Sequence, residues 1–448
     1  MSDAMLRGVL AGVADFVKYS KGMKYISPPL DVVKNILSMG TWNFPALEGI
    51  DEAPILRADG PVLDQEGYDK ATRTYYIPAP NLKVPAIPKE PTKKEFKKAL
   101  NLIEEIFVDY PFTDDISKAN TYALLLTPLI RAIFNGLAPM AVIDAPDRGT
   151  GKSMLADIVA LIATGRTASL MTAPTEEAEW RKKITSTLLE GAKTILIDNV
   201  TRPVHSDSLA TVLTSSFWED RVLGQNKNVR IKHTATWIIT GNNIKISGDL
   251  PRRCYWIRID AKTTQPWKRD GFKHKNLPKW VSKKRGKILA ALLTIVRAWL
   301  VAGAPKAKVK SLGSYDEWVK IVGGILKFAG ISGFLENIDA FYERTDDESL
   351  QWEDFLMGVR RHYGKHSFTT KVLHNRLKED DNLRGCLPDS LSDAFDNPKK
   401  SFERVLGKAL AQKEDVHHGK RQIRIKRAGM DGHAVRWKVV RKKLANSK

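Results

Sequence analysis

Hydrophobic and polar residues change their spacing several times along the chain, and each change marks a predicted structural unit. Between residues 139 and 265, short apolar runs alternate with stretches of helical period, which predicts an α/β sheet. The flanking segments 93–138 and 266–348 have a mainly helical period, so we expect helices there. Residues 1–92 predict a small α+β domain that ends in a stiff Pro-rich linker at 78–91.

The last hundred residues, 349–448, predict a separate helical unit that ends in a β-hairpin. Helical patterns occupy Leu350–Tyr363, Thr369–Glu379 and Ser401–Lys413. Two alternating strands follow, and an Asp-Gly pair at 431–432 predicts the tight turn between them. Three helices followed by a basic hairpin is the pattern of a winged helix, which predicts a DNA-binding unit.

The charge balance changes this picture by indicating a polyanionic partner. The 448 residues carry 72 Lys and Arg against 51 Asp and Glu, a net charge of +21. Such an excess is most often found in proteins that bind nucleic acid, and a generally basic, soluble surface is the alternative. Two cysteines cannot form a disulfide framework, so we expect a reducing cytoplasm. The apolar stretches are short or interrupted by charges, so we expect no membrane association.

A phosphate-binding loop is the main chemical motif of the chain. An apolar run from Ala141 enters a turn that contains Pro146, and a helical stretch follows. The turn has the layout of a P-loop, although Pro146 replaces the usual first glycine. We expect its backbone N–H groups to cradle the phosphates of ATP, with Lys152 at the β- and γ-phosphates and Ser153 on Mg²⁺. The predicted nucleotide-binding residues are Pro146, Gly149, Thr150, Gly151, Lys152 and Ser153.

Two further apolar strands end in polar residues that suit the same chemistry. Asp198 ends the first of these strands, where a carboxylate would join the Mg²⁺ shell. Asn199 follows it where many ATPases of this type have a catalytic Glu, so the base is open, with Glu177 or Glu179 as alternatives. Asn242 ends the second strand and would orient water beside the γ-phosphate.

A pair of arginines lies just beyond Asn242. In ring ATPases an arginine from the neighbouring subunit neutralises transition-state charge. Arg252 is the first candidate for this role and Arg253 the second, and one of them could instead have a structural ion pair.

Basic residues outside these motifs predict two DNA contacts. Residues 221–233 predict a hairpin just before the strand of Asn242, and its candidate phosphate contacts are Lys227, Arg230 and Lys232. In the predicted winged helix, the candidates are Arg404 and Lys408 on the third helix and Arg424 and Lys426 on the wing. Each set could equally be a solvated basic face.

The combined motifs resemble a known family. Pro-x-x-Gly-Thr-Gly-Lys-Ser at 146–153, Ile-Asp-Asn-Val at 197–200, Thr-Gly-Asn-Asn at 240–243 and Gly-Asp-Leu-Pro-Arg-Arg at 248–253 are similar to the helicase part of phage, plasmid and genomic-island primase-helicases. That group is similar to superfamily 3 and minichromosome-maintenance-like helicases. The resemblance implies an AAA+ core and a hexameric ring that moves on single-stranded DNA, with ATP between subunits.

Two functional hypotheses follow. The first is an ATP-dependent DNA helicase that replicates a mobile genetic element; because residues 1–92 hold no predicted primase site, the primase would be a separate protein. The alternative is a non-motor AAA+ initiator that binds a duplex origin and recruits a helicase. An ATPase of an antiviral or packaging system is a weaker rival, because no nuclease or portal-binding signature accompanies the motifs.

Overall fold

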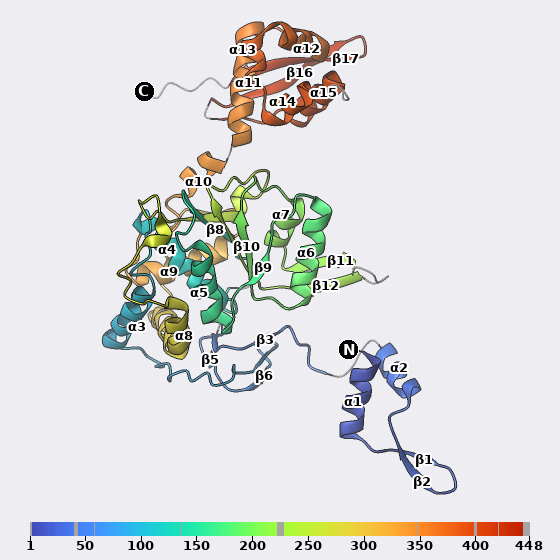
Figure 1. Cartoon of the computed structure of the whole chain (residues 1–448), viewed down its shortest axis with the longest axis vertical. Coiled ribbons are helices and arrows are strands. Elements are labelled where there is room, and N and C mark those ends of the chain that lie inside the picture. The colour runs from blue at the N-terminus through green and yellow to red at the C-terminus, as the bar shows by residue number, and fades with distance from the viewer. Residues whose placement is uncertain are drawn as a thin grey trace. The chain divides into compact units, whose positions relative to one another are not determined.

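The computed structural model describes residues 2–39, 44–57, 59–134, 136–221, 228–345, 347–397, 401–419 and 421–441 (Figure 1). The chain divides into two units, Met1–Gly49 and Ile50–Lys448. The expected boundary at residue 92 therefore does not coincide with the division of the chain.

The first unit contains two helices and a hairpin. Helix α1 spans Asp3–Val13, and the hydroxyl of Ser2 caps it by accepting from the Met5 N–H. Strands β1 (Phe16–Tyr19) and β2 (Met23–Ile26) pair antiparallel, and α2 (Leu30–Ser38) follows them.

The Pro-rich segment belongs to the core of the second unit. Leu82, Val84 and Ile87 pack against the same hydrophobic cluster as the central sheet. Arg297 donates from Nε to the carbonyl of Lys89 at 3.0 Å and from Nη1 to the carbonyl of Gly60. The segment expected to be a linker is thus a strap over helix α8 (Leu277–Val301). Short strands precede it, at Gly49–Asp51 (β3), Ile55–Leu56 (β4), Val62–Leu63 (β5), Gly67–Asp69 (β6) and Thr74–Tyr76 (β7).

A five-stranded parallel sheet forms the centre of the second unit, which confirms the predicted α/β fold. Its order is β14-β8-β13-β10-β9. The strands span Met140–Ala145 (β8), Ser169–Met171 (β9), Thr194–Val200 (β10), Thr236–Asn242 (β13) and Cys254–Arg258 (β14). Because β8, β13 and β10 are neighbours, their carboxyl ends meet at one edge of the sheet.

Helices surround this sheet. Within the sheet segment they are α5 (Lys152–Thr164), α6 (Glu177–Leu189) and α7 (Asp207–Thr214), and a separate hairpin pairs β11 (Phe217–Arg221) with β12 (Asn228–Lys232). The flanking helices are α3 (Lys93–Ile106), α4 (Asp115–Leu126), α8, α9 (Asp316–Phe328) and α10 (Ile338–Thr345). Figure 1 shows α5 beside α8, against which it packs. No helix in the described residues is long and apolar enough to cross a membrane.

The C-terminal segment has a hydrophobic core of its own, built around Trp352, Phe355 and Trp437. Its helices are α11 (Asp347–Tyr363), α12 (Thr370–Glu379), α13 (Asp381–Arg384), α14 (Asp389–Phe395) and α15 (Phe402–Gln412). Its antiparallel sheet has the order β15-β17-β16, formed by Phe368–Thr369 (β15), Ala434–Arg441 (β17) and Ile423–Asp431 (β16). The three predicted helices and the hairpin are present, whereas β15, α13 and α14 were not predicted.

The strap yields a stability prediction at Gly286. A Cβ at this position would overlap the carbonyl oxygen of Lys83. We expect Gly286→Ala to lower the free energy of unfolding by about 1–3 kcal/mol, because overpacking forces the strap away from α8. Chemical denaturation measures this change. Gly8→Ala in α1 is the matched control, because a Cβ there meets nothing within 4 Å, and a loss of equal size in both variants would contradict the strap.

Candidate nucleotide-binding site

The loop between β8 and α5 is shaped by two glycines in the left-handed region. Gly149 has φ 74° and Gly151 has φ 94°, and α5 begins directly after Gly151. Such conformations strain any residue with a Cβ. At Gly149 a Cβ would also lie 3.2 Å from the Cβ of Trp267. A glycine-rich turn directly before the start of a helix is an arrangement that can bind phosphate through backbone N–H groups.

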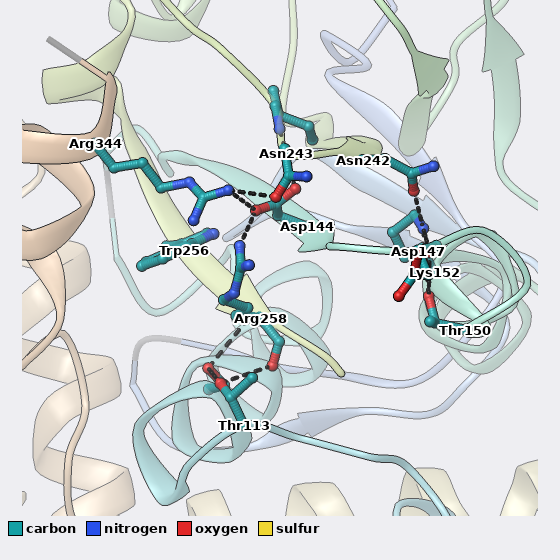
Figure 2. Close-up of polar contacts among 12 residues, drawn as sticks. Thr113, Asp144, Asp147, Thr150, Lys152, Asn242, Asn243, Trp256, Arg258 and Arg344 are labelled. Carbon is teal, nitrogen blue, oxygen red and sulfur yellow. Dashed lines mark hydrogen bonds and ion pairs between the residues drawn. The ribbon is translucent and has the colours of Figure 1, made fainter. Parts of the chain in front are cut away.

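Lys152 is the cation of this site. Its side chain is almost fully buried, and Nζ donates to Asn242 Oδ1 at 2.6 Å, to the Asp147 carbonyl at 3.0 Å and to Thr150 Oγ1 at 3.3 Å (Figure 2). Burial lowers the pKa of Lys152, and nearby carboxylates oppose that shift. The structure thus brings Lys152, Thr150 and Asn242 together. An anionic phosphate at this position would compensate the buried charge better than neutral oxygens do.

Ser153 and Asp198 meet beside the lysine. Ser153 Oγ donates to Asp198 Oδ1 at 2.6 Å, and Thr240 Oγ1 donates to the same oxygen at 2.6 Å. A hydroxyl and a carboxylate oxygen are the ligands that Mg²⁺ takes together with nucleotide phosphates and water. No group of three or more His, Cys, Asp or Glu side chains suited to a metal occurs in the described residues. These two residues therefore fit Mg²⁺ only together with the phosphates of a nucleotide.

The ends of β10 and β13 can approach closely because residue 241 is glycine. A Cβ there would lie 2.6 Å from the carbonyl oxygen of Val200, with which Gly241 pairs in register. This approach places Asp198 and Asn242 on adjacent strand ends. The spacing of the motifs in the sequence does not predict this close approach of the two strand ends.

The residues considered as a catalytic base are engaged elsewhere. Asn199 has φ 50°, its side chain is exposed, and its N–H donates to Thr240 Oγ1 at 3.0 Å. Glu177 Oε1 accepts from the Ser208 N–H at the start of α7; burial acts to raise the pKa of Glu177, but the hydrogen bonds from Ser208 outweigh it and lower that pKa. Glu179 pairs with Lys182 at 2.6 Å. Both glutamates thus stabilise local structure around α6.

A buried ion cluster next to the loop was not predicted. Asp144, 1% exposed, is the penultimate residue of β8, and its carboxylate pairs with Arg258 at 2.6 Å and with Arg344 at 3.6 Å (Figure 2). An acid inside an otherwise apolar strand was the available signal, because a buried charge needs partners.

The two arginines beyond Asn242 differ in their surroundings. Both pair with Asp249, but the side chain of Arg252 is 65% exposed and that of Arg253 is 12% exposed. Arg253 also donates to Thr214 Oγ1 at 2.8 Å. Arg253 therefore has a structural position within its own subunit, and Arg252 remains accessible to a neighbouring molecule.

The predicted DNA contacts lie in two separate places. Lys227 lies outside the described residues. Arg230 pairs with Glu219 at 2.9 Å and lies over the ring of Phe217, and Lys232 is exposed on β12. On the C-terminal hairpin, Arg424 and Lys426 share Asp415, at 3.3 and 3.1 Å.

The predicted third helix of the C-terminal segment presents its basic residues differently. Arg404 and Lys408 are exposed one turn apart on α15, and neither has an ion-pair partner in the part of the chain that the structure describes. Their charges are therefore more available to a polyanion than those of the hairpin.

No family model and no curated protein matches the chain. Among solved structures, the apo A form of the NrS-1 C-terminal region matches with a TM-score of 0.41 and 16% identity, covering 98% of this chain and 99% of that chain. The active helicase Cch of SCCmec type IV has a TM-score of 0.34 and 12% identity, covering 81% and 79%. The JCV helicase has a TM-score of 0.23 and 13% identity, covering 57% and 70%. All three similarities are weak in both sequence and structure.

The contrast between the two arginines predicts different effects on stability. We expect Arg253→Met to lower the free energy of unfolding by about 1–3 kcal/mol, because it strips a half-buried hydrogen-bond network of its donor. Arg252→Met should cost less than about 1 kcal/mol, since exposed ion pairs contribute little. Urea denaturation of both variants checks this. Equal losses would show that Arg252 has a structural role like that of Arg253.

Proposed function

We propose that this protein is an ATP-dependent DNA helicase of the AAA+ type that works as a ring. The observation that carries the proposal is the hydrogen-bonded set of Lys152, Asn242, Ser153 and Asp198 at the carboxyl ends of three adjacent strands. Phosphoryl transfer needs a cation on the phosphates, ligands for a metal ion and a group that orients water. In this set Lys152 would be the cation and Asn242 would orient the water. Ser153 and Asp198 would be the metal ligands.

Each residue has a distinct part in the proposed hydrolysis. The loop amides and Lys152 bind and orient the phosphates, while Ser153 and Asp198 would hold Mg²⁺. A bound Mg²⁺ would supply positive charge that neutralises the charge developing on the phosphates. Asn242 already accepts a hydrogen bond from Lys152, so its amide lies where the γ-phosphate end of a nucleotide would meet the lysine. An amide orients water without removing its proton. A carboxylate base from this chain is not part of the proposal.

A second subunit would complete the site. The exposed guanidinium of Arg252 lies beyond the strand end that carries Asn242, and an arginine delivered in trans is worth about 10³–10⁵ in rate. A head-to-tail interface gives a ring when the rotation between subunits closes, and the resemblance of the motifs suggests a hexameric ring. The same resemblance suggests replication of a mobile element with a separate primase.

DNA would be bound by the basic surfaces. The net charge of +21 favours phosphate contacts, and the hairpin β11–β12 immediately precedes the strand that ends in Asn242. In the C-terminal segment, the order of helices and the β15-β17-β16 sheet support a winged-helix assignment, with α15 as the helix that would enter a groove of duplex DNA.

The alternative is an AAA+ initiator that binds ATP as a switch and recruits a helicase. Asn199 in place of a carboxylate, with Glu177 and Glu179 engaged elsewhere, favours slow turnover. Strand displacement on a forked DNA by the purified protein separates the two functions. Unwinding that requires ATP supports the helicase, and origin binding without unwinding supports the initiator.

Lys152 gives the most direct test of the ATPase. We expect Lys152→Ala to reduce ATP hydrolysis and unwinding to background, because the cation that contacts the phosphates is gone. Lys327→Ala, an exposed lysine on α9, is the control and should retain wild-type rates. Substantial unwinding by Lys152→Ala would exclude the proposed site.

A mixing experiment tests whether the site is shared between subunits. Arg252→Ala and Lys152→Ala, each inactive alone, should recover about a quarter of the wild-type hydrolysis when combined in equal amounts, since that fraction of interfaces pairs an intact lysine with an intact arginine. No recovery, in mixtures shown to form joint oligomers, would place Arg252 outside the neighbouring site.

Salt dependence tests the role of α15. Replacing Arg404 and Lys408 with alanine should reduce the slope of log affinity against log salt by about two for duplex DNA, because each phosphate contact releases counterions. The double variant Lys320→Ala and Lys327→Ala on α9 removes the same charge and should leave the slope nearly unchanged. Equal slopes for both double variants would contradict a groove contact by α15.

A further inference from the structure

The turn that follows Asn242 is fixed residue by residue. Asn242 accepts from Lys152, and the Asn243 N–H donates to the Ala145 carbonyl at 3.1 Å. The Ile244 N–H donates to the carboxylate of Asp144 at 3.0 Å. Asn243 has φ 49°, in the left-handed region that asparagine adopts more readily than most residues with a Cβ. The position of Asn242 therefore depends on contacts made by the two residues after it.

Asp144 is the centre of those contacts. Its carboxylate is buried, and one oxygen accepts the Ile244 N–H while the other faces Arg258 at 2.6 Å and Arg344 at 3.6 Å. Two cations around one buried carboxylate compensate its charge and fix its orientation. These ion pairs thus support the hydrogen bond from the Ile244 N–H that holds the turn.

Arg344 contacts both the turn and Asp144. Nη2 donates to the side-chain oxygen of Asn243 at 2.6 Å and also faces Asp144 (Figure 2). The ring of Trp256 flanks both guanidinium groups, with its centroid 5.4 Å from Cζ of Arg344 and 5.3 Å from Cζ of Arg258. Arg258 belongs to the sheet, but Arg344 comes from the last turn of α10, outside it. Arg344 therefore connects the turn and Asp144 to helix α10.

We propose that Asp144 and Arg344 are positioning residues that hold the Asn242 turn in the geometry needed for hydrolysis. The proposal rests on the proposed ATPase function, because Asn242 orients water only in that setting. The effect of the two positioning residues passes through the backbone of Asn243 and Ile244 to the side chain that meets Lys152.

Arg344 is the residue to substitute. Asp144→Asn would leave two arginines around a neutral amide in a buried place, which threatens folding itself. Arg344→Gln removes the charge and the fork of donors at the edge of the cluster, and Arg258 continues to neutralise Asp144. Arg344→Lys keeps the charge but offers one compact ammonium, which cannot reproduce the planar contact with Trp256 and Asn243.

Hydrogen exchange of the full-length protein without nucleotide gives a readout independent of activity. We expect the Ile244 amide to exchange about tenfold faster in Arg344→Gln, with Arg344→Lys between this variant and the wild type. Amides in β8 and β10 should keep their rates. Lys327→Gln on α9 removes one positive charge at an exposed position and should change none of these rates.

Steady-state ATP hydrolysis is the second readout. Arg344→Gln should lower kcat about tenfold while KM changes less than about twofold, because the turn acts on the reaction rather than on binding. Unchanged exchange at Ile244, or a general rise that includes β8 and β10, would overturn the inference. A raised KM at constant kcat would do the same. Faster exchange confined to the turn, in a protein whose wild type does not hydrolyse ATP, would refute the proposed function and leave the positioning role intact.

Discussion

The hydrogen bond between Lys152 and Asn242 is the contact on which the candidate site depends. It joins the start of α5 to the end of β13 and holds a buried ammonium among neutral oxygens. Because its direct hydrogen-bond partners are all neutral oxygens, the ammonium would bind an anion more strongly, which suits phosphate. Neighbouring contacts serve the same end, since Ser153 and Thr240 orient the carboxylate of Asp198.

The order of strands explains why so few residues suffice. With β8, β13 and β10 side by side, the glycine-rich loop, Asp198 and Asn242 reach one edge of the sheet, although Lys152 of the loop and Asn242 are 90 residues apart in the sequence. Gly241 lets the ends of β10 and β13 approach, and the ion cluster at Asp144 fixes the turn beyond them. The candidate site therefore depends on the sheet and on two contacts from outside it. Lys152 at the start of α5 contacts Asn242, and Arg344 on α10 contacts Asn243.

The parallel sheet and the residues at its edge could be predicted, because an apolar run that ends in a polar residue is a local signal. The difference between Arg252 and Arg253 could not be predicted, since adjacent residues of one type are distinguished only by tertiary burial. The ion-pair partners of Asp144 are Arg258 and Arg344. They could not be predicted, because their distances from Asp144 in the sequence belong to no known motif. The proline content of residues 78–91 was misleading as a sign of a linker. A Pro-rich composition predicts a stiff segment, but it does not show whether that segment packs against the core.

The strap over α8 has a consequence for how the chain can be divided. Prolines restrict the unfolded chain, so a Pro-rich segment loses less conformational freedom than most when it is laid along a helix. Its apolar side chains cover part of the core, and a break at residue 92 would leave that part open to water. A minimal fragment that retains the five-stranded parallel sheet would therefore begin near residue 50, where the two units divide.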